Sequence, residues 1–265
     1  MREVIGFDCG GDRLAGTLDH AEGRTGLLIV SGGNEIRIGA HRGMALLAQR
    51  VAAAGYPVMR FDRRGIGDSE GRNRAFRESG DDIAAAARTF RQALPVERMV
   101  GFGNCDAATA LALFHQRAGI DALLLANPWV IEGESDLPPP AAIRARYAQR
   151  LRDPRQWLRL ASGGVNIGKL VKGLRNSARP PRKDNPLADA MAKALESSNA
   201  PTTILLAERD NTAIAFRAAF AQSGFAAIRA RADIAVRDTA SHSFARAGDA
   251  DWLFDRVIEA LQIFK

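Results

Sequence analysis

The chain has 265 residues, of which 46% are hydrophobic, and this is enough to bury the core of one α/β domain. Two cysteines cannot supply a disulfide framework, so we expect a protein of the reducing cytoplasm. From the apolar pattern of the chain, we expect neither a signal peptide nor a transmembrane segment. The net charge of +7 is uneven, because residues 141–183 hold twelve Lys and Arg against one acid and the rest balances at −4. That segment has few aromatic residues and no recognised nucleic-acid motif, so no nucleic-acid partner is expected.

Short apolar runs alternate with helix-like segments along most of the chain. The order favours an α/β fold with a mostly parallel, doubly wound sheet. A capping box of Ser79 and Asp82 is expected to open one of the helices. The expected strands are Val4–Phe7, Leu14–Leu18, Gly26–Val30, Tyr56–Phe61, Arg98–Phe102, Ala122–Ala126, Thr202–Ala207 and Ile228–Val236.

The alternation stops after the sixth expected strand. Three prolines, Pro138–Pro140, break the chain, and a basic region with helical spacing follows. We expect a helical, basic lid at 132–199, inserted into a core of 1–131 and 200–265. Its positive charge favours an acidic partner, and a solvated helical face without any partner is the alternative.

The most informative stretch is Gly103–Ala107, which lies between an apolar strand and an alanine-rich helix. It has the pattern of a nucleophile elbow, with Cys105 at the position of the nucleophile. The turn is so sharp that only small residues fit at the positions two before and two after the nucleophile, and Gly103 and Ala107 stand there. A small buried cysteine at a strand–helix junction is the alternative.

The partners of such a nucleophile follow it in the order acid, then histidine. His242 lies after the last expected strand and before the last helix, where the histidine is expected. Asp210 and Glu208 both follow the strand Thr202–Ala207, and we favour Asp210 because the loop must reach toward His242. The sequence therefore predicts a catalytic set of Cys105, Asp210 and His242.

The oxyanion of an acyl-transfer intermediate needs two backbone donors. We expect one at the N–H of Asp106, directly after the nucleophile, and the other at Gly33 or Asn34, after the third strand. The charge of Asp106 suits a helix N-terminus but repels a neighbouring thiolate. A neutral thiol at rest is therefore expected.

Phe61–Gly71 matches the loop pattern F-D-x-R-G-x-G-x-S-x-G, and over essentially its whole length the chain resembles α/β-hydrolases. It resembles most closely the exosortase A system-associated hydrolases of the first type. That resemblance implies a hydrolase-like role linked to bacterial exopolysaccharide production, with no firm substrate. The residues that carry it are Gly32, Gly33, Arg37–Gly39, His41, Arg42, Cys105, Asp106, Asn127–Trp129, Tyr147, Gln149–Leu151, Trp157, Arg209, Asp210, Thr212, Ala213 and His242.

Glu35 has two interpretations. Its place is similar to that of a loop glutamate in dienelactone hydrolases, which resemble this chain in their cysteine, aspartate and histidine, and there the glutamate interacts with the resting thiol. The resemblance makes Glu35 a possible modulator of Cys105. The alternative is a loop carboxylate paired with Arg37 or Arg42.

The leading hypothesis is a hydrolase of an ester or thioester, or an acyltransferase, that works through a covalent S-acyl intermediate. The basic segment favours a small-molecule or carrier-bound acyl substrate with an acidic group, such as one on an acyl carrier protein or an anionic lipid-linked glycan. No cofactor and no metal are expected. The competing hypothesis is a non-catalytic binding or scaffolding module of the same system.

Overall fold

An eight-stranded sheet forms the centre of the molecule in this computed structural model, which describes residues 1–131 and 185–264. The strands lie in the order β1-β2-β4-β3-β5-β6-β7-β8, and all from β4 to β8 are parallel. β1 and β2 form an antiparallel hairpin at one edge. The bounds are β1 Arg2–Cys9, β2 Asp12–Asp19, β3 Thr25–Val30, β4 Val58–Phe61, β5 Arg98–Asn104, β6 Ala122–Ala126, β7 Thr202–Ala207 and β8 Asp233–Arg237.

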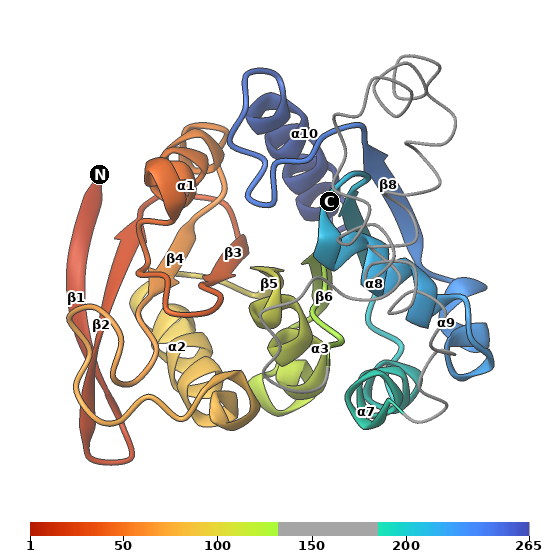
Figure 1. The fold of residues 1–265 in the computed structure, drawn as a ribbon. Helices are drawn as coiled ribbons and strands as arrows, with labels where there is room; N and C mark the ends of the chain where they lie inside the picture. Colours follow the sequence, from red (N-terminus) through yellow and green to blue (C-terminus); the bar gives the residue numbers. More distant parts are fainter. Residues whose placement is uncertain (132–184, 265) are drawn as a thin grey trace, which may run out of the picture.

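Helices cover both faces of the sheet (Figure 1). α1 (Gly43–Ala53) and α10 (Asp249–Gln262) pack together on one face, and α2 (Gly80–Ala93), α3 (Asp106–Ala118) and α7 (Pro186–Glu196) lie on the other. α8 (Asn211–Phe220) adds its phenylalanines to the same core as α3. The central strands are therefore buried on both sides, which explains their continuous apolar runs. The predicted α/β-hydrolase fold is confirmed.

The strand expected at Ile228–Val236 is wrong in its first half. The short helix α9 (Ala226–Arg229) stands there instead, and only β8 is extended. Ile228 lies buried in the same cluster as Phe216, Phe220 and Phe225. Alanines favour a helix at this point. The buried isoleucine of this short helix adds an apolar residue next to the strand, so the sequence pattern reads as one longer strand.

The capping box expected at the start of α2 is also wrong. Ser79 donates its hydroxyl to the carbonyl of Phe76 at 2.7 Å and caps no helical N–H. Asp82 accepts instead from the backbone N–H and Nε of Arg64, at 3.0 and 2.6 Å. A charged partner on a neighbouring loop therefore outcompetes the local cap.

Most of the expected lid, 132–184, lies outside the described residues. The end of the expected insertion forms α7, which packs against α3 and buries Leu187, Met191 and Leu195. This part of the expected lid thus contributes to the packing of the core. Among the described helices, none is long and apolar enough to cross a membrane.

The corrected boundary at α9 predicts a stability difference between two isoleucines. Ile228 is 1% exposed and Ile234 in β8 is 47% exposed. Ile228→Ala should lower the free energy of unfolding by about 2–5 kcal/mol, whereas Ile234→Ala should change it by less than about 1 kcal/mol. Urea denaturation of the two variants measures the difference. Equal losses would contradict the assignment of Ile228 to the core and of Ile234 to the surface.

Candidate active site

Cys105 occupies a strained turn between β5 and α3. Its backbone angles are φ 62° and ψ −125°, a conformation that side chains rarely adopt. The turn needs Gly103, because a Cβ there would lie 2.7 Å from the carbonyl carbon of Ala107. The Cys105 N–H donates to the carbonyl of Ala126 at 2.9 Å. The turn thus holds the thiol above the sheet at the N-terminus of a helix.

His242 joins the nucleophile to the acid. Its Nδ1 lies 3.1 Å from Oδ2 of Asp210, and its ring also forms a hydrogen bond with the side chain of Cys105. The hydrogen bonds with Asp210 and Cys105 raise the pKa of His242 to about 10. The structure brings the three predicted residues together.

Asp210 is held for this role by the helix that it caps. Its Oδ2 accepts from the N–H groups of Thr212 and Ala213 at 2.9 and 3.1 Å. Burial alone would raise the pKa of Asp210, but these donors and His242 hold that pKa below its ordinary value. Glu208, the competing carboxylate, is half exposed and faces Arg217 at 3.9 Å. The geometry therefore favours Asp210.

In the loop after β3, one of the two expected oxyanion donors already has an acceptor. The N–H of Gly33 donates to Oδ1 of Asp106 at 2.6 Å, so this expected donor already has an acceptor. Asn34 turns its side chain outward and accepts from Nδ2 of Asn73 at 3.0 Å. Asp106 remains well placed for its expected role, since the first N–H of a helix has no intrahelical acceptor.

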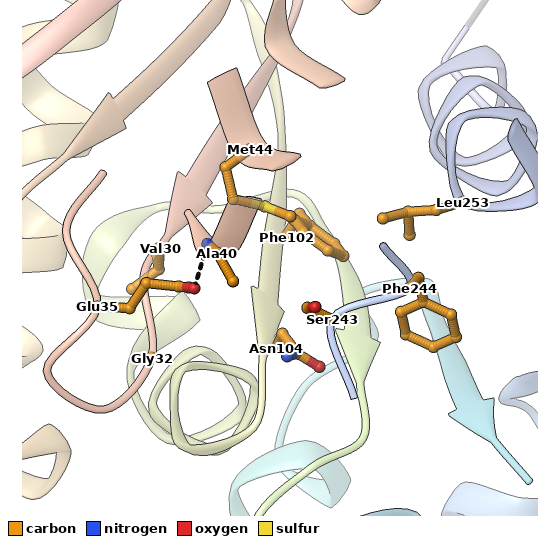
Figure 2. Close-up of a pocket in the computed structure, with 10 residues that line it drawn as sticks. All are labelled: Val30, Gly32, Glu35, Ala40, Met44, Phe102, Asn104, Ser243, Phe244 and Leu253. Carbon is orange, nitrogen blue, oxygen red and sulfur yellow. Dashed lines mark hydrogen bonds between the residues drawn. The ribbon is translucent and has the colours of Figure 1, made fainter. Parts of the chain in front are cut away.

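Glu35 lies against a small cavity beside this loop (Figure 2). Its Oε1 accepts from the N–H of Ala40 at 2.5 Å, as the dashed line shows. Burial raises the pKa of Glu35, and the charges of His242 and Asp106 also act on it. Among the described residues, Glu35 forms no ion pair with Arg37 or Arg42, and Arg37 pairs instead with Asp62 and Asp68. Glu35 is thus near enough to His242 for the charge of the histidine to act on it.

The sequence did not predict a functional role for two buried residues of the site. Asn127, at the end of β6, donates from Nδ2 to the carbonyl of His242 at 2.9 Å. Arg63 donates to the carbonyl of Gly33, and its Nη2 lies 3.9 Å from Oδ2 of Asp106. Asn127 lies in a motif that carries the family resemblance, but the resemblance assigns it no role. Its contact with the histidine loop, 115 residues away, has no local signal.

The other cysteine, Cys9, has a different environment. It is buried, and its Sγ lies 3.6 Å from Oδ1 of Asp82. Burial, followed by the charge of Asp82, raises the pKa of Cys9 to about 11. Such a thiol is protonated at neutral pH and unreactive. Within 1–131 and 185–264, no group of three or more His, Cys, Asp or Glu side chains is arranged to hold a metal ion.

Comparison with known proteins gives a family and a fold. A family model described as "Serine aminopeptidase, S33" matches residues 24–179, more than half of the chain. A search of the curated proteins returns no match.

Solved structures match across nearly the whole chain. The Pyrococcus furiosus esterase Pf2001 aligns with a TM-score of 0.65 and 16% identity, over 99% of this chain and 90% of its own. The α/β hydrolase GrgF from Penicillium sp. sh18 aligns at 0.64 and 18%, over 99% and 98%. The thioesterase domain from the curacin biosynthetic pathway aligns at 0.61 and 15%, over 97% and 99%. At these identities the likeness concerns the fold.

The contacts of the two carboxylates predict different effects on the thiol. Asp210→Asn removes the anion that raises the pKa of His242, so less imidazolium remains at pH 7 to stabilise a thiolate. Alkylation of Cys105 by iodoacetamide at about pH 7 should slow at least about tenfold, and turnover should fall by about 10²–10⁴. The matched control, Glu208→Gln, should leave both rates near those of the wild type. The reverse ranking would assign the orienting role to Glu208.

Proposed function

Because the chain belongs to the serine aminopeptidase S33 family and carries Cys105 at its nucleophile turn, we propose that it hydrolyses an ester or thioester through an S-acyl intermediate. The observation that carries the proposal is His242, which contacts both Asp210 and the side chain of Cys105. That bridge gives the thiol a base and gives the base an orienting anion.

The reaction has two halves. The Cys105 thiolate attacks the carbonyl carbon, a C–S bond forms, and the carbonyl π electrons become an oxyanion. When the oxyanion collapses, the bond to the leaving group breaks, and His242 supplies the proton that the leaving group takes. Water then attacks the S-acyl carbon as His242 removes its proton, and the thiolate returns when the C–S bond breaks. An acceptor other than water at this second step makes the same enzyme an acyltransferase.

An ester or thioester suits this site better than an ordinary amide. A thiolate that attacks a thioester forms the same kind of bond that it breaks, so the first half is nearly balanced in energy. Alkoxide and thiolate leaving groups also need less protonation than an amine. The names of an esterase and a thioesterase domain among the similar folds agree with this choice.

The substrate carries an acidic group in this proposal. The support is the excess of positive charge at 141–183, a segment that follows β6 in the sequence. In α/β folds, sites lie at the carboxyl ends of the strands. An acyl carrier protein and an anionic lipid-linked glycan both supply such a group. The resemblance to exosortase-associated hydrolases adds a role in exopolysaccharide production, and the two unpaired cysteines favour a cytoplasmic site of action.

Intact mass spectrometry tests the covalent step. Incubation with a panel of acyl thioesters and p-nitrophenyl esters should add the mass of one acyl group to the wild type and none to Cys105→Ala. Cys105→Ala should also lose turnover, with an unchanged melting temperature. Cys105→Ser should fold and retain weak activity at most, because an alcohol needs a stronger base than a thiol. A wild type that forms no adduct and turns over no member of the panel would favour the non-catalytic binding module.

The charge of 141–183 predicts a dependence on salt. Replacement of Arg144, Arg146, Arg150 and Arg152 by Gln should lower kcat/KM for a substrate on an acyl carrier protein at low salt, and leave a small neutral ester unaffected. The difference should shrink as salt rises, since the Debye length falls from about 30 Å at 0.01 M to about 8 Å at 0.15 M.

A second quadruple variant controls for net charge alone. Arg24, Arg98, Arg117 and Arg217 are each more than half exposed and each forms an ion pair, and Arg98 also lies over the ring of Phe264. Their replacement by Gln removes the same charge at little cost in stability. Equal losses of kcat/KM in the two variants would show that no local acidic-group site exists at 141–183.

A further inference from the structure

The carboxylate of Asp106 contacts an N–H group that is expected to be the second oxyanion donor. Its Oδ1 accepts from the N–H of Gly33 at 2.6 Å. Asp106 directly follows the nucleophile, so its carboxylate and any oxyanion formed on an acyl group at Cys105 compete for one N–H. Both are negative, and the competition is therefore electrostatic as well as steric.

The carboxylate lies close against the loop that it contacts. A Cβ on Gly32 would come within 2.7 Å of Oδ1 of Asp106 and 2.6 Å of the carbonyl oxygen of Asn104. Only glycine at position 32 leaves room for this arrangement. The contact is thus built into the packing of the loop after β3 against the nucleophile turn.

Arg63 provides a second place for the same carboxylate. Its side chain is 4% exposed, it donates to the carbonyl of Gly33, and its Nη2 lies 3.9 Å from Oδ2 of Asp106. Among the described residues, its buried Nη1 has no hydrogen-bond partner. A buried guanidinium with an unused donor is costly, and a carboxylate that moved toward it would supply the missing acceptor.

We propose that Asp106 is a specificity-determining latch: it closes the oxyanion site of the resting protein, and the site opens when its carboxylate leaves the Gly33 N–H for Arg63. The inference rests on the proposed function, since only a reaction that builds an oxyanion needs this donor. A small ester has few contacts with which to drive the opening and reacts slowly. A substrate anchored elsewhere on the protein supplies that binding energy.

Two reagents separate the latch from the reactivity of the thiol. Iodoacetamide alkylates Cys105 by displacing iodide and builds no oxyanion, whereas p-nitrophenyl acetate acylates it through one. The rates of both are measured at Cys105 by intact mass spectrometry, and their ratio cancels any change in thiolate content. In Asp106→Ala the ratio of acylation to alkylation should rise at least about tenfold, because one oxyanion donor is worth about 10²–10³ in rate.

Asp106→Asn is the matched variant. It removes the charge but keeps an oxygen that accepts from Gly33, so its ratio should rise by a smaller factor than that of Asp106→Ala. It also keeps the shape of the side chain and reports on the latch if the alanine variant fails to fold. An unchanged or lower ratio in the variants that fold would overturn the latch and assign Asp106 a supporting role in the loop.

A double-mutant cycle tests the destination of the carboxylate. Arg63→Gln should lower the acylation-to-alkylation ratio in the wild-type background, and by a smaller factor in the Asp106→Ala background, where no carboxylate needs a new partner. Equal factors would overturn the role of Arg63. Absence of acetylation at Cys105 in every protein, Asp106→Ala included, would overturn the proposed function itself, whereas acetylation with a constant ratio overturns the latch alone.

Discussion

The arrangement of the site depends on the side-chain amide of Asn127. This residue is fully buried at the end of β6, and its Oδ1 accepts from the N–H of Ala207 at the end of β7, at 2.8 Å. Its Nδ2 donates to Oδ1 of Asn104 at 3.2 Å and to the carbonyl of His242 at 2.9 Å. One side chain therefore connects the ends of three neighbouring strands to the histidine loop. Each buried group that it satisfies would cost about 1–3 kcal/mol if left unpaired.

As a consequence, the loops that form the site are held in fixed positions relative to one another. Asn104 adjoins the nucleophile, and Ala207 begins the turn that leads to Asp210. The far side of the histidine loop is held by Phe244, which stacks on Trp252 of α10 with ring centroids 5.4 Å apart. The three predicted catalytic side chains come from separate loops, yet hydrogen bonds and packing on both faces of the sheet fix their relative positions. Precision of this kind is what acid–base chemistry on a bound acyl group requires.

The sequence predicted the parts of this structure that depend on neighbours along the chain. The strand–turn–helix at Gly103–Ala107 and the order of Asp210 and His242 follow from local residue types and from the regular alternation of the fold. The capping error arises where a distant partner decides, since Asp82 binds Arg64 from another loop instead of capping its own helix. The contact of the Gly33 N–H with the carboxylate of Asp106, 73 residues away, also has no local signal. The pattern of residues along the chain carries no information about which loops contact each other.

The unequal environments of the two cysteines give the protein a natural reporter. Cys9 is buried beside a carboxylate that keeps its proton in place, whereas Cys105 is partly accessible and shares a hydrogen bond with His242. A fluorinated or spin-labelled thiol reagent at neutral pH should therefore attach to one position without any cysteine having to be removed. The spectrum of that label would report on the surroundings of the nucleophile turn in a chain without substitutions, and on any ligand that binds beside the blocked thiol.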